Sequence, residues 1–218
     1  MKKENLKKLS KNLPLTPGVL GRNRFFNSAV LIPLIKKKGE YFLLFQKRAA
    51  NIRQGGDICF PGGGFEEGID NNFEETALRE TYEELGIKAK DIKIIGRLDT
   101  YVAPIGAIIE PFVAKIKKSV LKTMIVDKSE VEKTLLIPVS FFKNTKAIEY
   151  TLSHEIQPYK IDENGKKEVL FPADKLGLPQ MYRKPWGNKR HKIWVYKYED
   201  EIIWGITSVI INDLIEKY

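Results

Sequence analysis

The most constraining feature of this sequence is the stretch from Phe60 to Ile87, FPGGGFEEGIDNNFEETALRETYEELGI. Within it, Glu80, Glu83 and Glu84 are spaced so that an α-helix places all three carboxylates on one face. Like charges this close repel one another by roughly a few tenths of a kcal/mol per pair. A hard divalent cation would offset that repulsion, so the spacing indicates a metal-binding helix. The alternative is a solvated acidic face on an ordinary amphipathic helix.

The two ends of this helix are also marked in the sequence. Asn72 and Glu75 form a capping-box pattern, and Gly86 stands where a left-handed C-terminal cap is expected. The pattern therefore predicts a helix between these caps. Residues three and four positions apart occupy the face opposite the glutamates and predict packing against a core: Leu78, Thr81 or Tyr82, and Leu85.

The run FPGG, the acidic loop after it and the run RETYEELGI together resemble the Nudix box. This loop–helix–loop pattern, G-x5-E-x7-R-E-U-x-E-E-x-G-U, marks hydrolases that cleave a nucleoside diphosphate linked to another moiety. The second half matches in register, whereas counting back from the helix puts Phe65 and Asn71 at the first Gly and Glu positions. The loop is therefore longer than the pattern. Asp70 or one of Glu66 and Glu67 takes the first acidic position, or that position is empty.

A second resemblance narrows the substrate. The segments Leu43–Arg48 and Gly56–Gly63, with Arg53 between them, are similar to the element upstream of the box in coenzyme A pyrophosphatases. Gln54 stands near where that subfamily often has histidine. Trp204–Thr207 resembles the segment that opens the last helix of the same subfamily.

The resemblance implies a metal-dependent hydrolase with a small nucleotide-diphosphate substrate. The expected reaction cleaves the pyrophosphate of coenzyme A or its acyl derivatives to 3′,5′-ADP and (acyl-)4′-phosphopantetheine. Two alternatives stay open: a Nudix hydrolase of ADP-ribose or another dinucleotide, and a non-catalytic Nudix-like binding module. The non-catalytic alternative predicts loss of the box glutamates, and this chain keeps all three.

The same resemblance suggests roles for residues of the helix. Glu80, Glu83 and Glu84 are the expected ligands of Mg²⁺ or Mn²⁺, since Mg²⁺ favours a few carboxylates together with several waters. Arg79 is expected to hold Glu83 in place, because the two residues are four positions apart. The general base is either a box glutamate or Glu130, which precedes a later strand.

Substrate contacts are expected just before the helix. Arg48 and Arg53 lie in the element that resembles the coenzyme A signature, and arginine binds phosphate through a fork of donors. They are therefore predicted to bind the 3′-phosphate, or alternatively the diphosphate itself or only solvent. The backbone of Gly62 and Gly63 is expected to pass close to the site, where side chains would clash.

Alternating apolar runs predict a fold of the α/β (α+β) class. Two hairpins are expected, 28–36 with 40–47 and 90–102 with 107–116. Further strands are predicted at 131–138, 149–161 and 193–198, a helical turn at 139–143 and a closing helix at 202–217. This pattern, and the Nudix resemblance, predict an α/β/α sandwich with a mixed β-sheet around a catalytic loop–helix–loop.

The predicted domain organisation has two parts. Residues 1–24 form a basic N-terminal arm or helix, and residues 25–218 form a single Nudix hydrolase domain with an irregular insert near 162–190. Met181–Trp194, the densest basic and aromatic stretch, is interpreted either as a solvated hairpin or as a lid that faces the substrate.

The net charge of +9 comes from 37 Lys and Arg against 28 Asp and Glu. The lysines are scattered without interleaved stacking aromatics, which argues against nucleic-acid binding. A positive field instead suits a small polyanionic substrate, which it attracts over a distance.

The remaining features predict a cytoplasmic enzyme. A single cysteine, Cys59, excludes a disulfide framework and favours a reducing compartment. The N-terminal MKKENLKKLSKN lacks the apolar segment of a signal peptide, and no apolar run is long enough to cross a membrane. A homodimer is left open as an assembly state.

Overall fold

The structure is a computed structural model that describes residues 2–218, apart from the side chains of residues 188 and 189. Eight strands form its main sheet: β1 (Phe26–Lys37), β2 (Glu40–Arg48), β3 (Ile58–Cys59), β4 (Gly62–Gly64), β5 (Ile92–Arg97), β6 (Tyr101–Ala103), β7 (Ala107–Ile116) and β8 (Val131–Pro138). The central order is β3-β2-β1-β7-β5, and β4, β6 and β8 pair with β1, β7 and β2. Because β1 runs parallel to β7 while the other pairings are antiparallel, the sheet is mixed.

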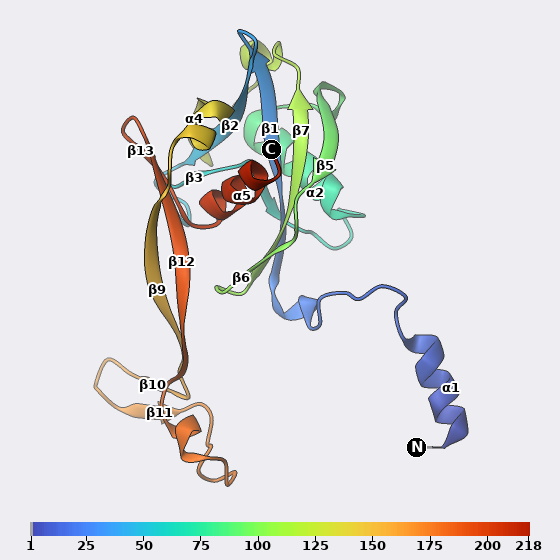
Figure 1. Cartoon of the computed structure of the whole chain (residues 1–218), viewed down its shortest axis with the longest axis vertical. Coiled ribbons are helices and arrows are strands. Elements are labelled where there is room, and N and C mark those ends of the chain that lie inside the picture. The colour runs from blue at the N-terminus through green and yellow to red at the C-terminus, as the bar shows by residue number, and fades with distance from the viewer. Residues whose placement is uncertain (1) are drawn as a thin grey trace.

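The helices are α1 (Lys3–Asn12), α2 (Phe73–Leu85), α3 (Val120–Thr123), α4 (Val139–Asn144) and α5 (Gly205–Glu216), with short 3-10 turns η1 (Arg22–Arg24), η2 (Ala89–Asp91) and η3 (Gln180–Arg183). Helices α2 and α3 pack on one face of the sheet, and α4 and α5 pack on the other. In Figure 1, α5 lies on the side of the sheet that faces the viewer and α2 on the far side. The predicted α/β/α sandwich is confirmed.

Period-two alternation along β1 and β2 divides the core between these two faces. Residues at even positions of β1 and odd positions of β2 pack beneath α4 and α5: Val30, Ile32, Leu34, Leu43 and Phe45. The intervening residues pack beneath α2: Ala29, Leu31, Ile35 and Leu44. The central strand is therefore buried on both sides, as its nearly continuous apolar sequence requires.

Most predicted elements are present, but several differ in their bounds, among them the predicted strand 149–161, which is divided into Ile148–Ile156 and Tyr159–Ile161. The hairpin of β1 and β2 is confirmed, as are strand β8 and the turn α4. The predicted strand 90–102 is interrupted at residues 98–100, which separate β5 from β6. The closing helix begins at Gly205 rather than at residue 202, because Glu201–Ile203 pair with the preceding strand as β13.

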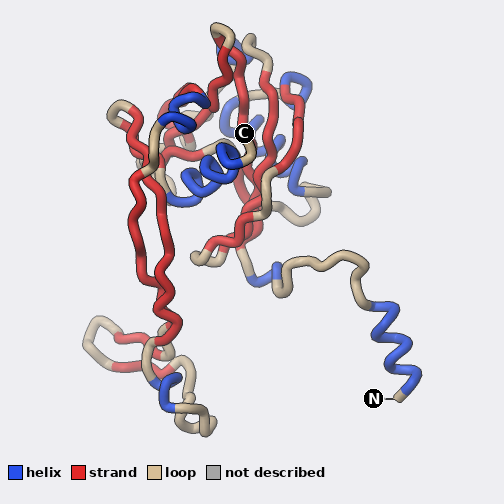
Figure 2. The backbone as a smooth tube through the Cα atoms, viewed as in Figure 1, coloured by secondary structure: helices blue, strands red, loops and turns tan. Residues whose placement is uncertain are grey.

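A long two-stranded arm leaves the body after α4. It consists of β9 (Ile148–Ile156) and β12 (Trp186–Tyr198), and β13 (Glu201–Ile203) extends its base. Figures 1 and 2 show the arm projecting from the body, with β10 (Tyr159–Ile161), β11 (Lys167–Val169) and η3 at its far end. The irregular insert is thus shorter than the predicted 162–190, because β12 already begins at residue 186.

Of Met181–Trp194, residues 186–194 form one strand of this arm, paired with β9, and the first residues belong to η3, so the segment is one side of a hairpin rather than a hairpin by itself. The far end of the arm lies away from α2, so the segment does not cover that helix as a lid (Figure 1).

At the other end of the chain, α1 has no buried residue and is joined to the body by an extended segment. In the part of the chain that the structure describes, no helix is long and apolar enough to cross a membrane.

Candidate active site

Helix α2 begins and ends at the predicted caps. The Asn72 side chain accepts a hydrogen bond from the backbone N–H of Glu75 at 3.0 Å. The Glu75 carboxylate accepts in return from the backbone N–H of Asn71 at 3.1 Å, one residue earlier than in a regular capping box. Gly86 closes the helix with a φ of 66°, in the left-handed region that glycine adopts without strain.

The buried face of α2 agrees with the predicted one only in part. Thr81 and Leu85 are buried as predicted, whereas Tyr82 is exposed, Leu78 is only partly buried and Glu84 is buried as well. The inward face is therefore rotated toward the glutamates, and one of the three predicted metal ligands, Glu84, points into the protein. The two others, Glu80 and Glu83, remain nearer the surface.

Arg79 is the centre of the polar network on this helix. Its Nε and Nη2 donate to the two carboxylate oxygens of Asp70, each at 2.9 Å. Nη2 also donates to the carbonyl of Gly64 at 2.9 Å. Because Arg79 donates these bonds, the pKa of Asp70 falls to about 2 and the pKa of Arg79 rises. Asp70 therefore takes the acidic position of the loop that the sequence left open.

Asp70 also organises the loop in which it lies. Its carboxylate accepts from the backbone N–H of Glu66 and from the hydroxyl of Thr76, both at 3.0 Å. The longer loop is thus closed onto the helix by one buried carboxylate.

We expect Asp70→Asn to lower the free energy of unfolding at pH 7 by about 2 kcal/mol, because the change breaks a largely buried charge pair. Urea denaturation measures this difference, with Glu67→Gln in the same loop as the exposed control. The difference should shrink as the pH falls through about 4 toward 2, where Asp70 itself becomes protonated. Equal stability of Asp70→Asn and wild type at pH 7 would contradict the assigned role.

The other end of the Arg79 guanidinium meets the outer glutamates. Nη1 donates to Glu83 at 2.9 Å and to Glu80 at 3.0 Å. Glu66 lies 3.6 Å from the same nitrogen. Arg79 therefore contacts the carboxylates of both Glu80 and Glu83. The contact with Glu83 was predicted from the spacing of four residues.

Glu84 is held by two donors from the sheet. Its carboxylate accepts from Gln46 Nε2 at 2.6 Å and from the backbone N–H of Gly62 at 2.9 Å. Only 2% of the residue is exposed, and this burial, with the nearby charges of Glu80 and Glu130, raises the pKa of Glu84 to about 7. Burial also raises the pKa of Glu80. Glu80, Glu84 and Glu130 therefore lie close enough together that ionising all three carboxylates at once is unfavourable.

The glycines of β4 are required by close contacts. Gly62 has a φ of 150°, and a Cβ there would meet the carbonyl oxygen of Ala29. A Cβ at Gly63 would meet the carboxylate of Glu80. The predicted close approach of this backbone to the site is thus observed, and it is directed at the glutamates of α2.

The loop that bears the predicted substrate-binding arginines adjoins this cluster. The backbone N–H of Ala49 donates to the carbonyl of Glu130 at 2.8 Å, which fixes the loop beside that glutamate. Arg48 Nε donates to the carbonyl of Arg53 at 3.1 Å, and Arg53 is exposed. Arg48 and Arg53 therefore lie on a loop fixed beside Glu130, whose charge reaches Glu80 and Glu84.

Two features of this region were missed by the sequence reasoning. The role of Gln46 was not predicted, although it is a polar residue on the α2 side of β2 that directly follows the apolar run of residues 41–45. Glu110 is buried on β7 and is bound by Arg22, Arg97 and Thr100. Cys59 is partly buried, and burial raises the pKa of its thiol to about 11, so it is not a thiolate nucleophile at neutral pH.

The donor set of this cluster suits a hard divalent cation. Glu80, Glu83, Glu84 and Glu130 supply carboxylate oxygens, and the pKa of Glu84 is raised by burial and by the charges of Glu80 and Glu130. Among the described residues, no three Asp, Glu, His or Cys side chains lie together in an arrangement that could hold a metal ion as it stands. The carboxylate oxygens of α2 are nevertheless of the kind that Mg²⁺ takes together with several waters.

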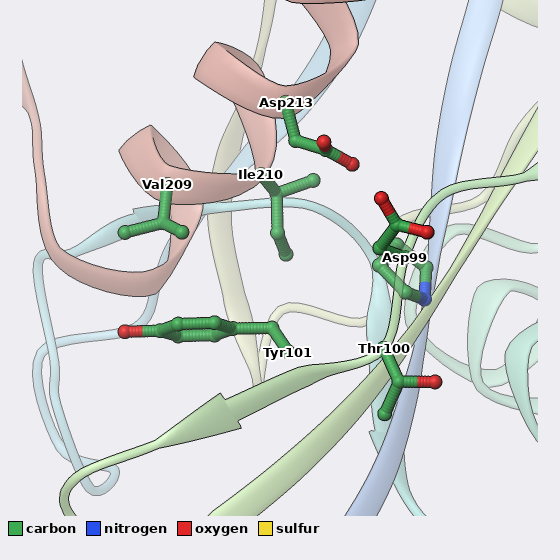
Figure 3. Close-up of a pocket in the computed structure, with 7 residues that line it drawn as sticks. Asp99, Thr100, Tyr101, Val209, Ile210 and Asp213 are labelled. Carbon is green, nitrogen blue, oxygen red and sulfur yellow. The ribbon is translucent and has the colours of Figure 1, made fainter.

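A separate hollow of about 180 Å³ lies between β6 and α5. Figure 3 shows Tyr101 facing Val209 and Ile210, with Asp99 and Asp213 at the rim. This hollow is on the α5 side of the sheet, whereas the carboxylates belong to α2, so it is not part of the carboxylate cluster.

Comparison with known proteins identifies the family. The NUDIX domain model matches residues 25–182, so the chain belongs to the Nudix family. "Nudix hydrolase 3" of Caenorhabditis elegans is 33% identical over 164 residues, which cover 69% of this chain and 68% of that protein. The mouse "Peroxisomal coenzyme A diphosphatase NUDT7" is 31% identical over 124 residues, covering 56% of this chain and 50% of the mouse protein.

Among solved structures, a C. elegans Ap4A hydrolase aligns with a TM-score of 0.44 at 18% identity, covering 52% of this chain and 80% of that one. The family match and the named hydrolase relatives show that the chain is a Nudix hydrolase. Enzymes of this family generally use divalent metal ions.

Proposed function

We propose that this enzyme hydrolyses the pyrophosphate of coenzyme A or its acyl derivatives to 3′,5′-ADP and (acyl-)4′-phosphopantetheine. The observation that carries the proposal is the loop with Arg48 and Arg53, tied through Ala49 to Glu130 beside the carboxylates of α2. The sequence of this loop resembles the coenzyme A pyrophosphatase element. A relative whose name is coenzyme A diphosphatase supports the same substrate.

Glu80, Glu83 and Glu84 are the residues that would hold Mg²⁺ or Mn²⁺. Such ions neutralise pyrophosphate oxygens and lower the pKa of bound water. Gln46 and the Gly62 N–H fix the orientation of Glu84, and Arg79 fixes Glu80 and Glu83. The protein thereby arranges its acceptors before the substrate arrives.

We assign proton abstraction from the attacking water to the carboxylate of Glu130. Glu84 is buried and both of its oxygens accept hydrogen bonds from the protein, so it is less accessible to an attacking water. Glu130 is exposed, and its backbone is fixed by Ala49. Its charge is near enough to contribute to the raised pKa of Glu84.

Substrate binding depends on charge outside the carboxylate cluster. Coenzyme A carries a diphosphate and a 3′-phosphate, and the chain has a net charge of +9. The positive field brings such an anion to the site, and Arg53, exposed on its loop, is assigned to the 3′-phosphate.

Arg53→Ala should therefore lower kcat/KM for coenzyme A by about 2 kcal/mol, as expected for the loss of a charge-assisted hydrogen bond. Steady-state kinetics with 3′-dephospho-coenzyme A should show a smaller loss, because that substrate lacks the phosphate. Asn51→Ala, an exposed uncharged position in the same loop, is the matched control. An equal loss with both substrates would assign Arg53 to the diphosphate instead.

Product analysis tests the reaction itself. The full chain is incubated with coenzyme A and Mg²⁺ or Mn²⁺, and the products are separated and identified. The expected pair is 3′,5′-ADP and 4′-phosphopantetheine. Rapid cleavage of ADP-ribose with coenzyme A left intact would show a Nudix hydrolase of another dinucleotide, and no cleavage of any diphosphate would favour a binding role.

A further inference from the structure

The arm ends in a small unit, residues 157–185, which connects β9 to β12 and is called the tip below. The antiparallel ribbon of β10 and β11 belongs to it, and directly opposed residues of such a ribbon share a face. Lys160 and Glu168 occupy one face and form an ion pair of 2.8 Å. The other face combines apolar and basic side chains: Tyr159, Ile161, Lys167 and Val169.

A hollow of about 160 Å³ opens on this second face of the ribbon. Among the residues that line it are Tyr159, Lys167, Val169, Phe171 and Arg183. These five residues and Ile161 are called the tip face below. Lys167 Nζ lies 3.8 Å from the centre of the Tyr159 ring, and Arg183 pairs at 2.6 Å with Asp174, the acidic residue of the hollow. The tip face is thus an apolar surface that carries two cationic side chains.

Large apolar side chains of the tip remain exposed to solvent. Their exposed fractions range from 38% for Phe171 to 65% for Ile161. The set consists of Ile161, Val169, Leu170, Phe171, Leu176 and Met181. Together they expose on the order of 600 Å², an amount comparable to the largest apolar patch of a typical soluble monomer. The tip lies at the end of the arm that is remote from the sheet, and no other described element covers it (Figure 1).

Basic residues are interspersed with these apolar ones. Residues 154–190 contain eight Lys and Arg against five Asp and Glu. Lys175 adjoins Leu176, Lys184 follows Met181 by three positions, and both lysines are exposed. A lysine can lay its aliphatic stem along an apolar surface while its ammonium group stays in a polar layer. The tip therefore presents apolar and cationic groups to the same partner.

We infer that the tip docks onto the surface of a lipid bilayer with anionic headgroups. The exposed apolar side chains enter the boundary between headgroups and acyl chains, and the lysines contact the lipid phosphates. Such binding grows with the apolar area buried and with the attraction between basic residues and anionic lipid. No helix of the described chain could cross a membrane, so the contact is peripheral. The arm would hold the carboxylates of α2 away from the lipid (Figure 1).

The composition of the tip favours lipid over nucleic acid. Five of the six exposed apolar residues are aliphatic and offer no ring on which a base could stack. The larger rings of this region are engaged with one another. Trp186 lies 5.5 Å from Tyr182 and 6.2 Å from Phe171, measured between ring centres. An aliphatic and basic surface matches the layered chemistry of a bilayer interface.

Flotation of the full chain with vesicles tests this docking, without any substrate present. Wild type is expected to bind phosphatidylcholine vesicles that contain phosphatidylserine, to bind pure phosphatidylcholine more weakly, and to lose binding as the salt concentration rises. Ile161→Glu should weaken binding at least about tenfold, because it places a charge in the apolar part of the tip face. The new carboxylate stands opposite Lys167, so the ribbon should keep its fold.

Thr151→Glu is the matched control, since it adds the same charge to the arm outside the tip, opposite Lys192. It should bind vesicles like wild type, and melting temperatures check the folding of both variants. Absence of wild-type binding to anionic vesicles at low salt would overturn the inference. So would equal binding by Ile161→Glu and wild type. Loss of binding in Leu6→Lys/Leu9→Lys alone would assign the contact to α1, and binding of single-stranded RNA but not of vesicles would make the tip a nucleic-acid surface.

Discussion

Glu83→Gln should lower kcat by at least about 100-fold, which corresponds to about 2.7 kcal/mol in the activation barrier. Glu83 projects from α2 toward solvent beside Glu80, and Arg79 fixes its orientation with an ion pair of 2.9 Å. Glutamine preserves the shape but removes the charge that a divalent ion needs. Steady-state kinetics at saturating metal and substrate measure the effect.

The fold should survive this change. The pair between Glu83 and Arg79 is largely exposed on the glutamate side, and exposed ion pairs contribute little to stability. The melting temperature should therefore remain close to that of wild type. Glu74→Gln, an exposed glutamate on the first turn of the same helix, is the matched control and should keep full turnover. Near-wild-type turnover of Glu83→Gln would remove this residue from the mechanism.

The second large effect is expected in the pH dependence of stability of the metal-free enzyme. The pKa of Glu84 is raised by burial from its ordinary value near 4.5 to about 7 in the folded protein. Between these two values the folded state binds the proton more tightly than the unfolded state, so stability falls as the pH rises. The full difference corresponds to roughly 3 kcal/mol lost between about pH 4.5 and pH 7.

Chemical denaturation at pH 5 and pH 8, in the presence of a chelator, measures this loss. Glu84→Gln keeps an acceptor for Gly62 and removes the titration, so its stability should change much less over the same interval. Mn²⁺ or Mg²⁺ added to the wild-type protein at pH 8 should restore the stability that it loses without metal. The ion has this effect because it binds the folded state and not the unfolded state. Asp70 does not interfere, because its pKa of about 2 lies far below this range. A flat profile for the metal-free wild type would contradict the buried position of Glu84.

Local patterns in the sequence were sufficient for much of the fold. The caps of α2, the turn between β1 and β2 and the i, i+4 pair of Arg79 and Glu83 depend on residues a few positions apart. Their geometry follows from helix and strand periodicity, which is why these predictions are confirmed. The Nudix resemblance rests on the same short segment, and the family match confirms it.

Other features depend on contacts between distant segments. The sequence offered Asp70, Glu66 and Glu67 as equal candidates, and only the folded loop brings Asp70 onto Arg79 with two hydrogen bonds. Gln46 meets Glu84 across 38 positions of the chain, so no local pattern could pair them.

The sequence by itself determined the family, the helix with its glutamates and the alternation of strands, because these are set by periodicity and by interactions within a few residues. Only the tertiary structure decided that Glu84 is buried, that Asp70 holds Arg79, and that β9 and β12 pair to form a projecting arm. The physical reason is that burial and pairing depend on which surfaces meet. A sequence pattern gives the direction of a side chain on its own element, but the neighbouring element that covers it comes from elsewhere in the chain.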